Sequence, residues 1–392
     1  MRLEDSVAFF TEETSVLASL DLCCGSAKGT FRALGGVRNL AGEAVTEHAI
    51  YDLASLTKLF TGVLVMRLHE QGRLDLESPV TGYAPMFSAL SQVSVDQILG
   101  FEISLQTPER VDQADTPANA KKTLFACQAQ PHTGTRMYSD MHAMVLRYVL
   151  EGAGGLAYMD LLRQEILEPL GIRGVYARIP AEKQEQCVSC DREHRIEGTR
   201  WILREGIAPG TPHDPKCRAL MDGEEQCAGH AGLFADMESM VAFVEGMLAG
   251  KILSRDALRA MARNRTGKQL PDGRYTQYLG SQCYVRHPQQ VHSEVPVFMS
   301  DHAMAVSGFT GHHLSLDPES GCYVIALGNR VLNRLTVVVP ETGRQLTDYG
   351  LDPNGRGSVI WPDGECIPSS VHYVYLRDAH MHRAVADTIG CI

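Results

Sequence analysis

The chain has 392 residues, of which 44% are hydrophobic and 21% are charged, and these proportions are ordinary for a globular protein. The length is enough for one large domain of two lobes or for two domains. The formal net charge of −11 argues against a nucleic-acid partner and against an anionic membrane surface, and it favours a soluble protein.

The first residues include Glu4 and Asp5 where a signal peptide would carry basic residues, and no apolar segment with a cleavage site follows. No run of about 18 apolar residues is present, so the sequence predicts no transmembrane helix. We therefore expect a cytoplasmic protein without a membrane partner. The 11 cysteines are then expected to be mostly reduced thiols in the core.

Apolar spacing predicts a short β segment followed by a long helical part. Residues 20–40 predict a strand, a turn and a second strand around several glycines. Residues 56–72 place apolar side chains at helical spacing and end at Gly72, which predicts a buried helix. Further helices are predicted over residues 139–153, over 156–170, and as a pair within 237–264 that breaks at Gly250.

Strands return in the last third of the chain, and this order indicates an α+β fold. A sheet built from both chain ends and flanked by a helical insertion fits the order of elements. Residues 173–227 and 331–370 lack clear periodicity and are predicted to be long loops. The late elements are strands over 278–285, 312–316 and 322–326, a hairpin turn at 317–321, and a terminal helix over 378–390.

The stretch Ser55-Leu56-Thr57-Lys58 stands at the start of the predicted buried helix. Helical side chains three positions apart share one face, so the Lys58 amine can reach the Ser55 hydroxyl and take or relay its proton. A serine hydroxyl needs such a base to act as a nucleophile. The alternative is an ordinary helix start, with Ser55 as the N-cap and Lys58 as a solvated first-turn residue.

Tyr138 lies in a loop just before the next predicted helix. Its phenol can point at the serine and at a leaving group, and it can act as acid or base if a nearby lysine lowers its pKa. The alternative is a packed loop aromatic, with Ser139 or Asp140 as a helix cap.

Residues 306–311, with the sequence Val-Ser-Gly-Phe-Thr-Gly, precede a predicted strand. A glycine-rich strand edge lets a substrate amide or ester approach the backbone closely. A backbone N–H here can join that of Ser55 in an oxyanion hole, and such a donor contributes a factor of about 10²–10³ in rate. The alternative is a strand kink or bulge.

His213 and Asp214 lie in the segment Thr-Pro-His-Asp-Pro, and His230 lies in Cys-Ala-Gly-His-Ala-Gly-Leu-Phe. One interpretation places these side chains near the pocket, where they line it or tie its loops together. The other is loop architecture, with Asp214 capping a turn and His230 hydrogen-bonded to the backbone.

Together and in this order, these segments resemble the serine β-lactamase-like superfamily, in the branch of class C β-lactamases, penicillin-binding D-Ala peptidases and family VIII esterases. The resemblance covers roughly residues 20–330 and the terminal helix. Ser55 and Lys58 match the nucleophile and lysine of the Ser-x-x-Lys motif. Tyr138 to Asp140 is similar to Tyr-x-Asn, with aspartate in place of asparagine. Residues 308–311 look like the end of His-Thr-Gly-Phe-Thr-Gly, which stands where β-lactamases have Lys-Thr-Gly.

The resemblance implies a β-lactamase/transpeptidase-like α+β fold in a single domain over residues 1–392. The antiparallel sheet lobe would comprise about 1–55 and 270–392, and the mainly helical lobe about 56–269. The implied catalytic residues are Ser55, Lys58 and Tyr138. The implied oxyanion and substrate-binding residues are Ser55, Asp140, Ser307, Gly308 and Phe309, and the candidates for pocket lining are His213, His230, Thr310 and His312.

Val306 departs from the family pattern because it occupies the place of the lysine or histidine that opens the third motif. A valine offers neither a cation nor a side-chain hydrogen bond to a substrate carboxylate. The leading hypothesis is therefore a serine hydrolase that cleaves a small ester or amide through an acyl-enzyme on Ser55. The alternatives are a β-lactamase or D-Ala-D-Ala-type peptidase, a catalytically weak ligand-binding member, and a transacylase.

In this mechanism Lys58 and Tyr138 activate Ser55, and the sequence leaves open which of the two is the base. No cofactor and no metal are required. Cys187 and Cys190 have one half of a zinc-site spacing, but a second close ligand pair is absent, so free thiols are the favoured interpretation. The expected partner is a small-molecule substrate, and the oligomeric state is open.

Overall fold

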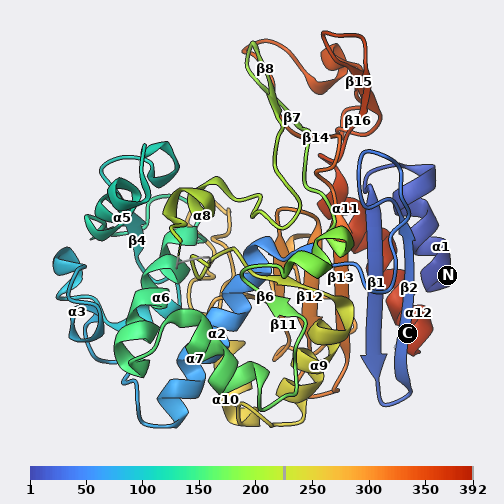
Figure 1. Ribbon diagram of the computed structural model, residues 1–392. Coiled ribbons are helices and arrows are strands. Elements are labelled where there is room, and N and C mark those ends of the chain that lie inside the picture. The colour runs from blue at the N-terminus through green and yellow to red at the C-terminus, as the bar shows by residue number, and fades with distance from the viewer. Residues whose placement is uncertain (224–226, 391–392) are drawn as a thin grey trace.

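A six-stranded antiparallel sheet with the strand order β10-β11-β12-β13-β1-β2 forms the centre of the computed structural model, which describes residues 1–223 and 227–390 (Figure 1). Both ends of the chain contribute to this sheet, as the sequence predicts. The strands are β1 (Ser19–Ser26), β2 (Gly29–Gly36), β10 (Tyr284–Val285), β11 (Met304–Gly308), β12 (His312–Leu316) and β13 (Tyr323–Asn329).

Strand β1 separates two hydrophobic cores because successive side chains of a strand point to opposite faces. Leu20, Leu22 and Cys24 pack with the terminal helices, whereas Cys23 belongs to the core that holds the central helices. Both chain termini lie beside this outer face (Figure 1). The terminal elements are α1 (Leu3–Ala8), η1 (Phe9–Glu13), α11 (Tyr373–Leu376), η9 (Arg377–Met381) and α12 (His382–Ile389).

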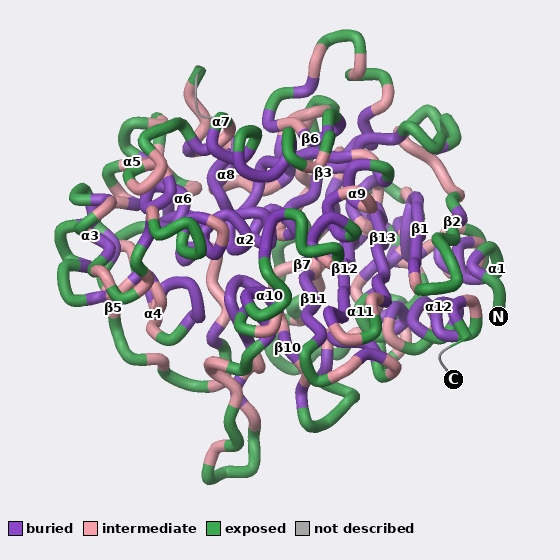
Figure 2. Tube along the Cα trace, turned by 90° about the horizontal axis from the view of Figure 1, so that it is seen from below, coloured by how far each residue is buried: buried purple, intermediate pink, exposed green. Residues whose placement is uncertain are grey.

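Helix α2 (Thr57–Glu70) runs through the centre of the helical part and is buried along most of its length (Figure 2). A helix that is apolar nearly all round must be covered on every side. Helix α6 (Asp140–Gly154) packs directly against it. The other helices here are α3 (Val80–Tyr83), α4 (Val95–Leu99), α5 (Pro117–Phe125), α7 (Tyr158–Leu162), η5 (Arg163–Leu167), α8 (Pro215–Leu220), α9 (Met237–Leu248) and α10 (Arg255–Met261).

Short strands and 3₁₀ turns fix the loops around the helices. Strand β9 pairs with both β3 and β6, which joins the segment before the buried helix α2 to two distant loops. These elements are β3 (Tyr51–Asp52), η2 (Ala54–Leu56), η3 (Ser88–Leu90), β4 (Ser104–Gln106), η4 (Val111–Gln113), β5 (Gln128–Gln130), β6 (Val175–Tyr176), η6 (Ala181–Gln186), β9 (Phe234–Ala235) and η7 (Gln290–His292).

The prediction that residues 173–227 and 331–370 are long loops is wrong for much of their described length. Strand β7 from the first segment pairs in parallel with β14 from the second, and this sheet projects from the main body over its own small apolar core (Figure 1). The pairing of strands so distant in sequence cannot be detected from local periodicity. Residues 224–226 of the first segment lie outside the described residues. The strands and turn are β7 (Glu193–Glu197), β8 (Arg200–Arg204), β14 (Arg334–Val339), η8 (Leu346–Tyr349), β15 (Ser358–Ile360) and β16 (Cys366–Pro368).

The predicted helices are confirmed, including the break at Gly250, which has a φ of 71°. The predicted strand over 278–285 is wrong except at its last two residues. The chain instead turns back at Gln282, whose φ is 58°, so Leu279 bridges to Tyr284. The lobe boundaries stay a prediction.

The contact between α3 and α6 depends on the absence of a side chain at Gly152. A Cβ at this position would overlap the carbonyl oxygen of Tyr83, so Gly152→Ala must push the two helices apart. We expect it to lower the free energy of unfolding by roughly 1–3 kcal/mol, measured by urea denaturation. Gly82→Ala is the matched control, because its Cβ would meet no atom within 4 Å. Equal stability of the two variants would contradict this packing.

Candidate active site

Ser55, the predicted nucleophile, lies in the turn between β3 and α2, and the residue before it is conformationally strained. Ala54 has a φ of 45°, a left-handed conformation that costs a non-glycine residue about 1–3 kcal/mol. The buried Asp52 carboxylate holds this turn, because it accepts hydrogen bonds from the N–H of Ala54 at 2.9 Å and of His213 at 2.6 Å. The turn presents the half-buried Ser55 at the start of α2.

Lys58 is completely buried one helical turn after Ser55 and directs its ammonium group at the nucleophile. Its Nζ donates to Ser55 Oγ at 2.8 Å and to the carbonyl oxygen of His230 at 3.3 Å, and it forms an ion pair with Asp140 Oδ1 at 2.8 Å. The alternative interpretation of Lys58 as a solvated first-turn residue is therefore wrong, and its amine reaches the Ser55 hydroxyl as predicted. An ammonium group inside the core needs such partners to offset the loss of water.

Tyr138 lies close to Ser55, whose side chain acts to lower the pKa of the phenol. Its ring also faces Lys58, whose Nζ is 4.9 Å from the ring centroid. Burial, together with the negative charge of Asp140, raises the pKa of Tyr138 above its ordinary value. The phenol is thus held in its neutral form, which can donate a proton.

Asp140 is the first residue of α6, and its carboxylate joins Lys58 to a second lysine, Lys216 of α8. Lys216 Nζ donates to Asp140 Oδ2 at 2.9 Å. Burial alone would raise the pKa of the Asp140 carboxyl, but Lys58 and the neighbouring cationic groups hold it well below its usual range. Asp140 is therefore a carboxylate between two ammonium groups.

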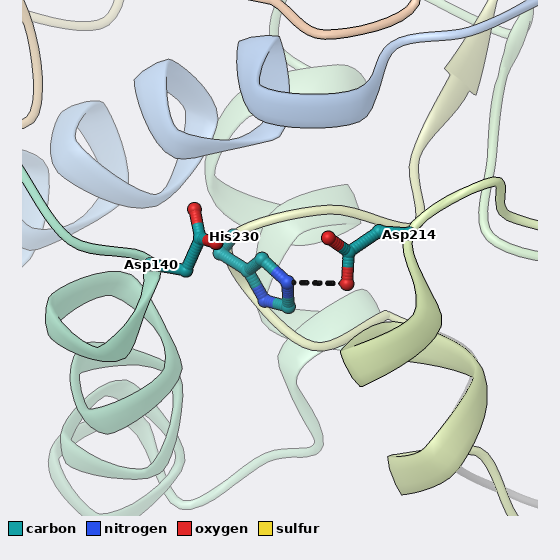
Figure 3. Close-up of side chains that lie close together, drawn as sticks. All are labelled: Asp140, Asp214 and His230. Atoms are coloured by element: carbon teal, nitrogen blue, oxygen red, sulfur yellow. Dashed lines mark hydrogen bonds and ion pairs between the residues drawn. The ribbon is translucent and has the colours of Figure 1, made fainter. Parts of the chain in front are cut away.

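Asp214 and His230 extend this network on its far side. Asp214 caps the N-terminus of α8 and contacts His230 Nε2 at 2.9 Å (Figure 3). Burial opposes ionisation of Asp214, yet His230 and Lys216 lower its pKa. Asp214 caps a helix, as one interpretation expected, but the His230 ring binds the Asp214 side chain and not the backbone, and it thereby ties the two loops together. The carbonyl oxygen of His230 accepts a hydrogen bond from Lys58.

Three side chains of this network could also hold a metal ion by distance alone. The ligand atoms of Asp140, Asp214 and His230 lie within 4.8 Å of one another, and they are the single such set in residues 1–223 and 227–390. Two ammonium groups already touch Asp140, so this donor set is better matched to an ion-pair network than to a cation. Cys187 and Cys190 are buried free thiols outside the set.

The backbone beside Ser55 carries two free donors. Within the described part of the chain, the N–H groups of Ser55 and Phe309 donate to no other protein group. A Cβ at Gly308 would lie 3.0 Å from the carbonyl oxygen of Leu53, so the end of β11 packs closely against the turn that carries Ser55. Strand β10 covers β11 only as far as Ala305, which leaves its last residues as an open edge.

The side chains of Thr310 and His312 stabilise the turn that carries Ser55 and do not line a pocket. Both side chains are about 1% exposed, and both donate to the carbonyl oxygen of Asp52, at 3.1 and 2.5 Å. His312 Nδ1 accepts the N–H of Gly328, which places the ring proton on Nε2. Burial lowers the pKa of His312 to about 4, so the ring is neutral at physiological pH.

His213 and Ser307 also have partners within the protein. The His213 ring contacts Glu193 at 3.1 Å and stacks on the half-exposed Phe309 ring. The Ser307 hydroxyl donates to Glu294 and accepts from Arg377, both at 2.8 Å, and not from Lys58. These contacts support the walls of the site.

Two cavities lie on either side of Tyr138. A cavity of about 690 Å³ is bounded by Arg136, Glu294 and Tyr284, and the Tyr284 ring stacks on Tyr138 at 5.6 Å. A second cavity of about 410 Å³ is bounded by Tyr138, Asp140 and Lys216. Ser55 lines neither of these two cavities, and the second one reaches the network at Tyr138, Asp140 and Lys216.

The sheet, the buried Ser-x-x-Lys pair and the adjacent tyrosine define a protein of the serine β-lactamase-like superfamily, a group of hydrolases. The chain belongs to the β-lactamase family, whose profile matches residues 25–341. No helix within residues 1–223 and 227–390 combines the length and apolar character that a membrane span requires.

Curated relatives and solved structures agree with this assignment. A putative D-alanyl-D-alanine carboxypeptidase of Salmonella gallinarum is 24% identical over 314 residues, which are 73% of this chain and 70% of that protein. The Salmonella typhimurium protein of the same name has the same identity and coverage. EstCE1, a hydrolase with promiscuous acyltransferase activity, superposes with a TM-score of 0.65 at 18% identity over 83% of this chain and 92% of its own. A class C β-lactamase does so with a TM-score of 0.62 at 15% identity and the same coverage. These structural likenesses establish the fold.

Sequence reasoning missed Lys216 and the carboxylate clamp of Asp52. In the sequence Asp52 stands out only as part of the segment before Ser55. No local pattern shows that its carboxylate accepts a hydrogen bond from the N–H of His213, 161 positions later. Lys216 stands two positions after Asp214 in the His-Asp-Pro segment, and that proximity was the available signal. The links of Ser307 to Glu294 and Arg377 had no sequence signal.

The buried neutral His312 makes stability depend on pH. Its folded pKa of about 4 lies below the ordinary value of 6.5, so the unfolded chain binds more protons between these values and stability falls as pH drops through this window. From pH 7 to pH 5 the loss is roughly 2 kcal/mol from this group. In His312→Gln, urea denaturation should show a correspondingly smaller drop, whereas the exposed His48→Gln should keep the full drop. Identical drops in both variants would contradict this assignment.

Proposed function

We propose that the protein is a serine hydrolase that cleaves a small ester or amide through an acyl-enzyme on Ser55. The observation that carries this proposal is the 2.8 Å contact of Ser55 Oγ with a fully buried lysine. A buried charge is costly, and its placement beside a half-buried serine that follows the strained Ala54 serves no packing purpose. Activation of the hydroxyl is the function that this arrangement supports best.

Lys58 takes the proton of Ser55 in this mechanism, and Tyr138 acts as the acid. The raised pKa of Tyr138 supports this division, since a neutral phenol donates a proton to the leaving group more readily than it accepts one. The serine oxygen then attacks the substrate carbonyl, and the bond to the leaving group breaks as that group is protonated. Water, activated in reverse by the same residues, releases the acid.

The developing oxyanion would be bound by the N–H groups of Ser55 and Phe309, which have no protein acceptor among the described residues. Fixed donors that point at the position of the developing charge contribute a factor of about 10²–10³ each. The open edge of β11 beside them can pair with an extended substrate, as an added strand would.

A D-Ala-D-Ala-type peptidase or β-lactamase is the second candidate, because curated relatives are named as putative D-alanyl-D-alanine carboxypeptidases. Val306 counts against it. Its side chain is 1% exposed and packs in the core, so it cannot bind the carboxylate that such substrates carry. A transacylase would use the same acyl-enzyme, and EstCE1 is a hydrolase with promiscuous acyltransferase activity. Product formation that depends on an added alcohol would identify it.

Intact-mass spectrometry tests the covalent step. After incubation with a fluorophosphonate, we expect the wild-type mass to increase by one phosphonyl group and the Ser55→Ala mass to stay unchanged. The wild type should also hydrolyse p-nitrophenyl acetate without forming a stable adduct with penicillin. A stable penicillin adduct on Ser55 would favour the peptidase candidate, and the absence of any adduct dependent on Ser55 would contradict the proposal.

The Tyr138→Phe variant tests the role of Tyr138 as the acid independently of the role of Ser55 as the nucleophile. It removes one hydroxyl and keeps the ring, so we expect kcat/KM for p-nitrophenyl acetate to fall by about 10²–10³, while the melting temperature changes little. Tyr375→Phe is the matched control, because Tyr375 is 60% exposed and lies on a terminal helix. An unchanged kcat/KM in Tyr138→Phe would show that this hydroxyl has no part in the reaction.

A further inference from the structure

Lys216 is the second ammonium group of the site, and the Ser-x-x-Lys motif does not contain it. It lies in the first turn of α8, where its Nζ is 2.9 Å from Asp140 Oδ2. Lys58 contacts the other oxygen of the same carboxylate at 2.8 Å. Asp140 is therefore shared between two lysines, one fully buried and one with about 30% of its side chain exposed.

The network joins two carboxylates to two lysines. Lys216 also approaches Asp214 Oδ2 at 3.7 Å, and Asp214 in turn binds the His230 ring at 2.9 Å. The two carboxylates and the two ammonium groups meet across the ends of α2, α6 and α8. The hydroxyl groups of Ser55 and Tyr138 complete the surroundings, and Asp112 of η4 is a more distant acid in the field of Lys216.

An aspartate beside Lys58, the proposed general base, favours the protonated amine, whereas a neutral asparagine would not. Asp140 orients Lys58 through a short ion pair, but an unshared carboxylate would also stabilise the protonated amine and so oppose its action as a base. A second cation on the opposite oxygen reduces this effect without disturbing the geometry. Burial disfavours the charge of Lys216, but Asp140 and Asp214 raise its pKa. Lys216 therefore stays protonated while it offsets the charge of Asp140.

We propose that Lys216 is a positioning residue that neutralises Asp140, so that Asp140 can hold Lys58 toward Ser55 without retaining its proton. This inference rests on the proposed function of Ser55 and Lys58. It assigns Asp140 and Lys216 a joint role, since Lys216 is needed because residue 140 is an aspartate. It also accounts for a second lysine in a site whose third motif has lost its cation at Val306.

The pH dependence of kcat/KM for p-nitrophenyl acetate tests the proposal. In Lys216→Met the carboxylate acts on Lys58 alone, so the acid limb of the profile should move to higher pH by about one unit. Activity below the limb should then fall by about tenfold and recover at alkaline pH. Lys216→Arg keeps the charge and should restore most of the wild-type profile. Melting temperatures show whether each variant is folded, and Lys216→Gln replaces Lys216→Met if the latter is not.

The Asp140→Asn background distinguishes this role from a merely structural one. Without the carboxylate only the direct repulsion between the two ammonium groups remains, so adding Lys216→Met to Asp140→Asn should shift the acid limb by much less than Lys216→Met does alone. An unshifted limb in Lys216→Met overturns the proposal, and so does an equal shift in both backgrounds. The rate of Ser55 labelling by a fluorophosphonate, followed over the same pH range, gives a second readout. Absence of wild-type labelling is a different result, which would overturn the proposed function itself.

Discussion

The fully buried ammonium group of Lys58 is the constraint on which the rest of the structure depends. An unpaired charge in the core would unfold a protein of ordinary stability, so every group around it must supply an acceptor or a countercharge. Asp140 at the start of α6, the carbonyl oxygen of His230 and the hydroxyl of Ser55 do so. This explains why α2, α6 and the 227–234 segment converge on one point although they are far apart in sequence.

A second group of contacts keeps the nucleophile in place. The positive φ of Ala54 is tolerated because Asp52 binds the turn through its carboxylate, while the hydroxyl of Thr310 and the ring of His312 bind its carbonyl oxygen. His312 belongs to β12 of the six-stranded sheet, and Thr310 lies in the turn between β11 and β12. This side of the fold thus supports the turn, and the helices α6 and α8 supply the charges of the site from Asp140 and Lys216. Contacts from both sides can keep Ser55 and Lys58 at a fixed distance.

The class of fold and the placement of Lys58 beside Ser55 could be predicted from the sequence, because both leave local patterns. Helical spacing after Ser55 and the order of strands and helices correctly predicted a sheet made from both chain ends. The pairing of β7 with β14 could not be predicted, since it joins segments about 140 residues apart. Lys216 was missed for the same reason, because its role appears only when α8 is placed against α6. Thr310 and His312 were expected at the pocket, but a strand pattern does not show which face of the strand the turn covers.

A structure of the protein with a phosphonate bound to Ser55 would test the central claim most directly. We expect one phosphonyl oxygen to accept hydrogen bonds from the N–H groups of both Ser55 and Phe309. We also expect Lys58 to keep its ion pair with Asp140 and Tyr138 to face the leaving-group side. A phosphonyl oxygen directed away from both N–H groups, or a Lys58 displaced from Asp140, would contradict the account.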